Sequence, residues 1–210
     1  MQITFREYQK EDFQALENVI RKTWHYDDLC SPKTAQKLAR VFLSSCLTNY
    51  TFSCVALNAG VPVGIILVNN KAKHKCPLRL RIQQIKALTA LFLSKEGRGV
   101  FKIFENVSGI DKELLQECGI KYPAELALFA VDASCRGKGI GKQLFQSALE
   151  YINQEKLDKF YLFTDTSCNY GFYEHQGMVR RKEKAHRFDV KGQTAKMNFF
   201  IYDYVKKGNL

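Results

Sequence analysis

A glycine-rich, basic loop near residues 132–142 carries the strongest chemical signal in this chain. It follows an apolar run, 125–131, typical of a buried strand, and precedes an amphipathic stretch, 139–155, typical of a helix. Three glycines lie among three cationic side chains there: Gly137, Gly139 and Gly141 with Arg136, Lys138 and Lys142. Unpaired N–H groups at a helix start attract anions, and glycines let a ligand approach the backbone closely. The loop therefore predicts a site for a pyrophosphate.

Two common phosphate-binding motifs do not fit this loop. A P-loop requires serine or threonine after its lysine, whereas Gln143 follows Lys142. A dinucleotide-binding turn requires Gly-x-Gly-x-x-Gly directly after a strand, and the spacing of the glycines does not match it. The simplest alternative is a glycine-rich turn that only links a strand to a helix, but such a turn does not need interleaved cations.

A third signature, Arg/Gln-x-x-Gly-x-Gly/Ala, is met by Arg136, Gly139 and Gly141. In this the loop resembles the acetyl-CoA-binding motif of the GNAT superfamily of N-acetyltransferases. Residues 161–178 are similar to the second motif of that superfamily, in which asparagine, a short helix with a Phe-Tyr pair and a glycine follow a strand. The opening segment, 3–8, is weakly similar to the usual start of such chains.

The resemblance implies acetyl-CoA as the cosubstrate and assigns residues to it. The backbone of Phe129, Ala130 and Val131 would pair with the pantetheine amides, and the Val131 N–H would polarise the thioester carbonyl. The pyrophosphate would be held by Arg136, Gly137, Lys138, Gly139, Ile140, Gly141 and Lys142. Asn169 would bond the pantetheine arm, with a helix N-cap as its alternative role. Nothing in the sequence indicates metal ligation, so no metal is expected.

Two side chains are candidates for the proton transfers of amine acetylation. By resemblance, Tyr173 would protonate the departing thiolate; its alternative role is to pack the short helix. Glu125 corresponds to a glutamate that serves as general base in part of the superfamily; its alternative is a solvated charge at a strand end. A base helps because an alkylammonium group loses its proton only near pH 10. No covalent intermediate is required, so no cysteine is nominated.

Acceptor recognition is predicted from one short segment, which lies between the first two expected helices. It contains Trp24, Tyr26, Asp27 and Asp28. The resemblance implies that this region lines the acceptor site, where aromatic faces beside carboxylates would suit an ammonium group. Alternatively, Trp24 closes the core and the two aspartates face solvent.

The net charge of +11 over 210 residues is concentrated in two stretches, 71–86 and 180–187. Nucleic-acid binding is one explanation for such density, but neither stretch is interleaved with the regular aromatic residues that stack bases. We therefore favour a solvated surface that steers a polyanionic cofactor, and do not expect nucleic acid as a partner.

The chain gives no sign of export or of a membrane span. No apolar run reaches transmembrane length, and the N-terminal residues lack the apolar core of a signal peptide. The seven cysteines are scattered, with no Cys-x-x-Cys, which favours neither a disulfide framework nor a zinc site. We expect a cytoplasmic protein with no membrane partner.

The pattern of apolar residues predicts one α+β domain over 1–210, with a mixed, mostly antiparallel sheet flanked by helices. A helical insertion, 69–122, precedes the cofactor-binding strand. One apolar stripe contains Leu78, Ile82, Ile85, Leu88 and Phe92, and a second follows over 100–107. Asp111 is predicted to cap a third, short helix that ends before Gly119. Such stripes pack against the domain or a second subunit, as in a homodimer; a substrate lid is the alternative.

These features lead to one main hypothesis and two alternatives. The main hypothesis is an acetyl-CoA-dependent N-acetyltransferase that acts directly on a primary amine of a small molecule, a peptide or a protein. A non-catalytic acyl-CoA sensor would keep the loop but not the set Tyr173, Asn169 and Glu125. A basic nucleic-acid-binding module would use the two cationic stretches, and its binding would weaken with salt.

Overall fold

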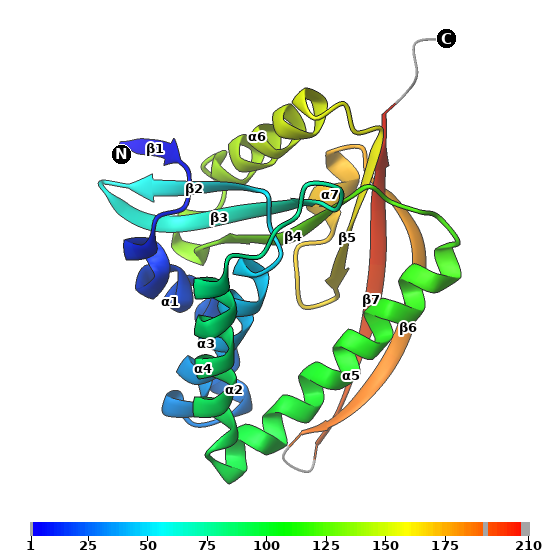
Figure 1. Cartoon of the computed structure of the whole chain (residues 1–210). Coiled ribbons are helices and arrows are strands. Elements are labelled where there is room, and N and C mark those ends of the chain that lie inside the picture. The colour runs from blue at the N-terminus through cyan, green and yellow to red at the C-terminus, as the bar shows by residue number, and fades with distance from the viewer. Residues whose placement is uncertain (1, 191–192, 207–210) are drawn as a thin grey trace.

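The computed structural model describes residues 2–190 and 193–206 and contains one seven-stranded sheet (Figure 1). The strands are β1 (Ile3–Arg6), β2 (Phe52–Asn58), β3 (Val61–Asn70), β4 (Ala124–Val131), β5 (Lys159–Asp165), β6 (Val179–Val190) and β7 (Gln193–Val205). Their order is β1-β2-β3-β4-β5-β7-β6, and every neighbouring pair is antiparallel except β4 with β5. The predicted mixed, mostly antiparallel sheet is confirmed.

Helices cover both faces of this sheet. They are α1 (Phe13–Thr23), α2 (Tyr26–Leu29), α3 (Pro32–Leu47), α4 (Leu78–Phe92), α5 (Lys95–Cys118), α6 (Ile140–Gln154) and α7 (Gly171–His175), with short 3-10 turns at Lys10–Asp12 and Ala133–Cys135. The central strands β2, β3 and β4 are apolar because both of their faces are buried. One face packs under α6, and the other packs against α1 and α3. That residues 1–210 form a single domain stays a prediction.

The sheet opens between β4 and β5. These strands pair only at Ala124 with Phe160 and at Glu125 with Tyr161, and Figure 1 shows β5 turning away from β4 beyond that point. On the other side, β4 stays paired with β3 up to Val131, and the Asp132 N–H donates to the Val63 carbonyl at 2.8 Å. Because N–H direction alternates along an antiparallel strand, the N–H groups of Phe129 and Val131 point away from β3 and into the opening.

The insertion before β4 consists of two helices, not the three that the sequence predicts. α5 runs unbroken from Lys95 to Cys118, so the prediction that Asp111 caps a separate helix is wrong. Ser94 caps α5 by accepting a hydrogen bond from the Gly97 N–H at 3.0 Å, and Gly119 ends it in the left-handed conformation, as predicted. α5 stays continuous because Ile110 and Leu114 pack against a third core cluster on β5 and β7.

The side of α4 that packs on the domain carries only part of the predicted stripe. Leu80, Ala87 and Leu91 are buried there, and of the predicted stripe Leu88 packs against the same core cluster while the other four residues face outward. Leu78, Ile82, Ile85 and Phe92 of that stripe are all exposed. The helical spacing was recognised correctly, but a helix with two apolar faces does not reveal from sequence which of them the domain covers.

Two glycines in the first turns of α5 are expected to respond oppositely to alanine. A Cβ on the buried Gly97 would lie 2.2 Å from the Leu91 carbonyl oxygen, whereas a Cβ on Gly99 would meet nothing within 4 Å. We expect Gly97→Ala to lower the free energy of unfolding by about 1–3 kcal/mol, and Gly99→Ala to raise it by up to about 1 kcal/mol. Urea denaturation of the two variants measures both changes. Equal effects at both positions would show that α5 does not approach Leu91 as described.

Candidate functional site

The opening between β4 and β5 holds a cavity of about 340 Å³. Its lining includes eleven of the residues predicted from sequence: Trp24, Phe129, Ala130, Val131, Arg136, Gly137, Gly139, Gly141, Lys142, Asn169 and Tyr173. Four others that the sequence analysis did not assign also line it: Thr23, Ser167, Cys168 and Phe172. Segments far apart in the chain therefore meet where β5 leaves β4.

The rim of this cavity is the predicted anion-binding loop. Gly137 and Gly139 have φ values of 74° and 77°, which only glycine adopts without strain, and α6 begins immediately after Gly139. The N–H groups in the first turn of α6, including those of Gly141 and Lys142, have no intrahelical acceptor. No side chain caps this helix start. Backbone donors, the helix dipole and the Lys142 cation thus converge at one end of the cavity.

Two of the predicted loop residues lie elsewhere. The Lys138 ammonium donates to the Ser134 carbonyl at 3.0 Å and does not line the cavity. Ile140 is the first residue of α6, and its side chain is buried in the core, where it anchors the start of the helix. Asp132 holds the preceding turn by accepting from the Ser134 N–H at 2.9 Å. The loop is therefore braced by Ser134 and Asp132 on one side and by Ile140 on the other.

Aromatic rings from β4 and α7 form one wall of the cavity. The Phe129 ring lies 5.4 Å from the Phe172 ring and 6.3 Å from the Tyr173 ring, centroid to centroid. A Cβ on Gly141 would lie 3.5 Å from the Phe129 ring and 3.8 Å from the Phe172 ring. This glycine therefore keeps the space between the helix start and the aromatic wall open.

Tyr173 is the buried acid–base candidate within the cavity. Burial raises the pKa of its phenol far above the usual value, and the neighbouring Cys168 and Asp165 shift it in the same direction. Among the residues that the structure describes, no hydrogen bond to its hydroxyl is found. The phenol therefore stays protonated at neutral and moderately alkaline pH and has a proton to donate into the cavity.

Glu125 does not line the cavity. It lies on β4 at the last residue that pairs with β5, just before the two strands separate. Asn49 donates to its carboxylate at 3.3 Å, and Asn69 in turn donates to Asn49 at 2.6 Å. Asp111 of α5 belongs to the same region: burial first, and then the negative charges of Glu125 and Asp165, raise its pKa to about 7. Carboxylates from α5, β4 and β5 thus share one weakly hydrated space. The role of Glu125 as a base stays a prediction.

The predicted acceptor segment is divided by the fold. Trp24 lines the cavity and packs on Phe42 with ring centroids 5.0 Å apart. Tyr26 is buried, with its ring 5.7 Å from that of Phe104. Asp27 forms a bidentate ion pair with Arg21, and Asp28 lies 3.9 Å from His25. Of the four predicted acceptor residues, the structure brings Trp24 alone to the cavity lining, and their role stays a prediction.

The raised pKa of Asp111 predicts a pH-dependent stability. Its pKa is about 7 in the folded chain against 3.8 as a free side chain, so the folded state holds the extra proton between these values. Stability must therefore fall as pH rises through that window. We expect Asp111→Asn to remove this fall, so that the variant gains about 1–2 kcal/mol over wild type between about pH 4 and pH 8. Thermal denaturation of both proteins across this range measures the difference; parallel curves would contradict it.

The described residues contain neither a metal-binding cluster nor a membrane-spanning helix. No group of three or more histidine, cysteine, aspartate or glutamate side chains in 2–190 and 193–206 is arranged to hold a metal ion. No helix in the same part of the chain is both long and apolar enough to cross a bilayer.

Comparison with known proteins points to one family. The model of the Acetyltransferase (GNAT) family matches residues 109–178, a range that contains both sequence motifs. This confirms the resemblance drawn from Arg136, Gly139 and Gly141. No curated protein matches the chain.

Solved structures share the fold at low sequence identity. The ribosomal-protein-alanine N-acetyltransferase from Brucella melitensis has a TM-score of 0.57 and 13% identity, covering 96% of this chain and 99% of that chain. An N-acetyltransferase from Staphylococcus aureus has a TM-score of 0.55 and 15% identity, covering 99% and 100%. The PaiA N-acetyltransferase from Thermoplasma acidophilum, solved in complex with coenzyme A, has a TM-score of 0.51 and 15% identity, covering 98% and 99%. At these identities the likeness concerns the fold.

Proposed function

We propose that this chain is a GNAT-family acetyltransferase, as the match of the family model to residues 109–178 supports, and that it transfers the acetyl group of acetyl-CoA directly to a primary amine. The observation that carries this proposal is the cavity between β4 and β5. An anion-binding helix start, the outward N–H groups of β4 and the protonated Tyr173 all meet there. Coenzyme A offers one group to each: a pyrophosphate, pantetheine amides and a thiol sulfur.

The loop would bind the pyrophosphate through the first-turn N–H groups of α6, with Arg136 and Lys142 supplying charge. The β4 N–H groups of Phe129 and Val131 face the opening and would bond the pantetheine arm and the thioester carbonyl. Asn169, on the cavity lining, would add a bond to the arm. In this arrangement the acetyl group lies close to the divergence of the strands.

From a bound ammonium, the reaction needs two protons removed from the nitrogen, one before attack and one after, and one proton supplied to the sulfur. The amine nitrogen attacks the thioester carbonyl carbon, the C–S bond breaks, and the sulfur leaves as a thiolate that takes the Tyr173 proton. The protons of the nitrogen pass towards Glu125, directly or through water. A bound ammonium would also favour the ionised form of Asp111, so Glu125, Asp111 and Asp165 together suit a cationic acceptor. We retain the cytoplasm as the proposed location, from the scattered cysteines.

Calorimetric titration with acetyl-CoA and CoA, followed by thiol release with a panel of primary amines, tests the proposal. Tight binding and amine-dependent thiol release would support it. Binding without turnover on any amine would favour the acyl-CoA sensor. No binding of either compound would overturn the proposal. Retention on DNA or RNA that falls with salt, and that CoA does not displace, would then favour the nucleic-acid alternative.

A further inference from the structure

The outer face of α4 is an apolar stripe that is largely exposed in the described part of the chain; at its C-terminal end the Phe92 ring also packs on Phe101 of α5, with ring centroids 4.6 Å apart. At 100° per residue, positions 78, 82, 85, 92 and 93 lie within about 100° of the helix circumference; Thr89 lies among them. The exposed fractions are 74% for Leu78, 44% for Ile82, 54% for Ile85, 39% for Phe92 and 80% for Leu93. α4 runs along α3 (Figure 1) and packs on the domain through Leu80, Ala87 and Leu91. Single exposed apolar residues are normal, but an ordered stripe of five is an interaction surface.

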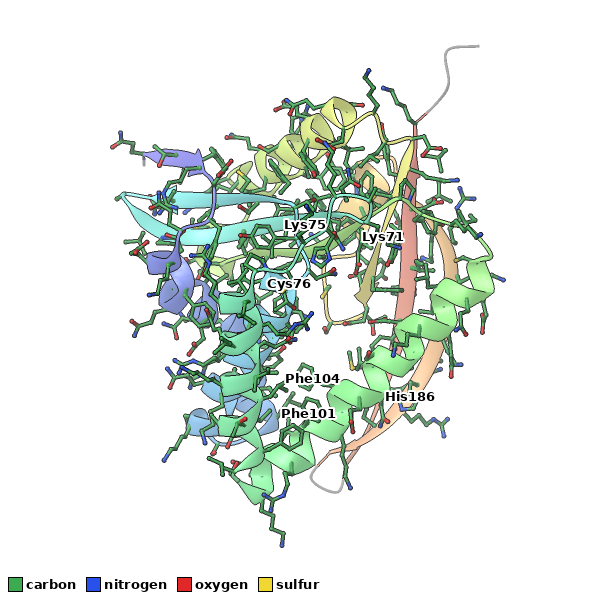
Figure 2. The ribbon with its side chains drawn as sticks, viewed as in Figure 1. Lys71, Lys75, Cys76, Phe101, Phe104 and His186 are labelled. Carbon is green, nitrogen blue, oxygen red and sulfur yellow. The ribbon has the colours of Figure 1, made fainter. Side chains whose placement is uncertain are left out.

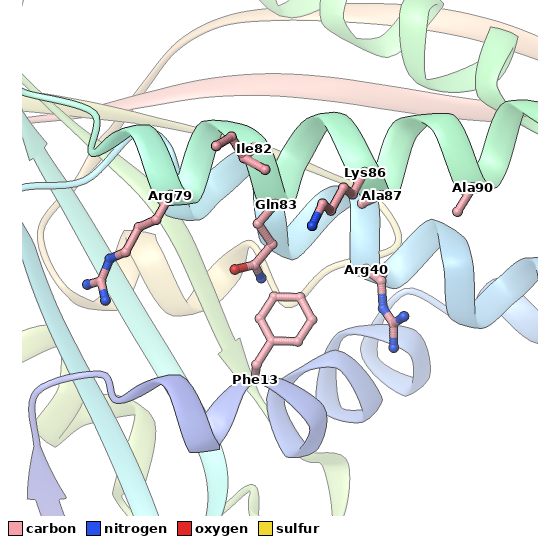
Figure 3. A pocket seen from close by; sticks show the side chains of 8 residues that line it. All are labelled: Phe13, Arg40, Arg79, Ile82, Gln83, Lys86, Ala87 and Ala90. Carbon is pink, nitrogen blue, oxygen red and sulfur yellow. The ribbon is translucent and has the colours of Figure 1, made fainter.

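Cations flank this stripe on both sides. Arg79 and Lys86 follow one edge of it and Arg81 follows the other. Figure 3 shows Arg79 and Lys86 leaving α4 on the side of Phe13, where they border a groove of about 400 Å³ together with Arg40. Arg40 is paired with the buried Glu17 at 2.8 Å. Within the described residues, neither Arg79 nor Lys86 forms an ion pair.

Carboxylates are missing from this whole segment of sequence. Residues 71–95 contain seven lysines and arginines and no aspartate or glutamate. Lys71 and Lys75, labelled in Figure 2, lie on the loop that leads into α4. The next carboxylate, Glu96, is turned towards α3, where it accepts from the Ser31 N–H at 2.9 Å and from the Thr34 hydroxyl. The exposed face of α4 therefore consists of an apolar stripe with cationic side chains along its edges and no carboxylates.

We propose that this α4 face, defined by Leu78, Ile82, Ile85, Phe92 and Leu93 with Arg79, Arg81 and Lys86, docks the protein on an anionic membrane surface. An amphipathic helix with cations along both edges of its apolar stripe lies in the plane of the interface, with the stripe among acyl chains and the cations at the headgroups. The groove beside Arg79 and Lys86 would take a headgroup phosphate. This proposal departs from the expectation of no membrane partner, which rested on the lack of an apolar run of transmembrane length; docking of this kind needs no spanning segment.

The charge pattern argues against a second copy of the chain on this face. Two α4 helices packed stripe to stripe would bring six cations together with no carboxylate between them. The α4 face also has the convex form of one helix, and a lipid surface, unlike a protein partner, needs no matching shape to cover it. Homodimerisation through the insertion is therefore the weaker prediction for this helix.

Sedimentation with vesicles of phosphatidylcholine alone, and of phosphatidylcholine mixed with phosphatidylglycerol, tests the proposal on the full chain. We expect binding to the mixed vesicles only, weakened by high salt. Arg79→Gln and Lys86→Gln should each weaken it about fivefold, and Ile82→Ser and Ile85→Ser about tenfold each. The matched controls are Val61→Ser and Val205→Ser, which remove similarly exposed apolar side chains from β3 and β7 and should change nothing. Acetyl-CoA binding and melting temperature verify that each variant is folded.

Three results would overturn the proposal. One is no binding to anionic vesicles, or equal binding to both kinds. Another is binding by the stripe variants as tight as that of the wild type. The third is a dimer in analytical ultracentrifugation that Ile85→Ser dissociates while vesicles stay unbound, which would assign the stripe to a second copy. Binding of polyglutamate without vesicle binding would assign it to an acidic polypeptide instead.

Discussion

Replacement of Gly141 by glutamate is expected to abolish acetyl-CoA binding without lowering the stability of the fold. Gly141 is the second residue of α6, where a carboxylate interacts favourably with the helix dipole. A Cβ at this position makes only ordinary contacts, at 3.5 Å and 3.8 Å. The same carboxylate would occupy the end of the cavity where we place the pyrophosphate. We expect affinity to fall at least about a hundredfold, equivalent to roughly 2.7 kcal/mol, while the melting temperature stays equal or rises.

The opposite signs of the two effects make this a sharp test, measured by calorimetry and thermal denaturation. Gly109→Glu is the matched control, because it adds the same charge on α5 at a glycine with no atom within 4 Å of its Cβ. Gly141→Ala separates bulk from charge and should weaken binding only mildly. Gly139 is less suitable, since its φ of 77° would strain any side chain and confuse lost binding with lost folding. Wild-type affinity in Gly141→Glu would move the pyrophosphate away from α6.

The anion-binding loop could be predicted because its determinants are local in sequence. A strand, alternating glycines and a helix within about twenty residues require no knowledge of the remaining chain. The Phe-Tyr pair was likewise found at a fixed distance after Asn169. What local reasoning could not supply is the point where β5 leaves β4. That divergence brings Thr23 and Cys168 to the same cavity.

The insertion shows how tertiary packing overrides local signals. Asp111 sits in a sequence that suits a helix start, and Gly97, Gly99 and Gly109 all weaken helix propensity. Nevertheless, α5 is continuous because its far end is held against β5 and β7. This continuity turns Asp111 from a capping residue into a half-buried carboxylate near Glu125. The proximity of Asp111 to Glu125 cannot be predicted from sequence spacing, because it depends on where α5 crosses the sheet.

The predicted acceptor residues do not lie together in the structure, for a related reason. Trp24, Tyr26 and Asp27 are nearly consecutive, and this closeness in sequence predicts one shared surface. The left-handed backbone at His25, with a φ of 51°, starts a new helical turn that sends Tyr26 into the core and Asp27 towards Arg21. Three adjacent side chains therefore point in three directions. A positive φ at a residue other than glycine is uncommon, and the sequence gives no warning of it.

Tyr173→Phe is expected to lower kcat about a hundredfold to a thousandfold while leaving the Kd for acetyl-CoA unchanged. The substitution removes one hydroxyl and keeps the ring that packs on Phe129 and Phe172. Because no hydrogen bond to this hydroxyl is found among the described residues, its loss should not lower the melting temperature. The departing thiolate would then leave without its proton donor. Thiol release under saturating acetyl-CoA and amine measures kcat, and calorimetry measures Kd.

Tyr170→Phe is the matched control. It also removes a tyrosine hydroxyl, three residues before Tyr173, but the Tyr170 ring packs on Phe200 and does not line the cavity. It should leave kcat unchanged.

The pH dependence of kcat provides a second readout. Because the pKa of Tyr173 is raised, the phenol keeps its proton above its usual range, and wild-type kcat should not fall between about pH 8 and pH 10 from loss of that proton. An unchanged kcat in Tyr173→Phe would reduce Tyr173 to a packing residue and require another donor, because the sulfur must still be protonated within a cavity that buries it.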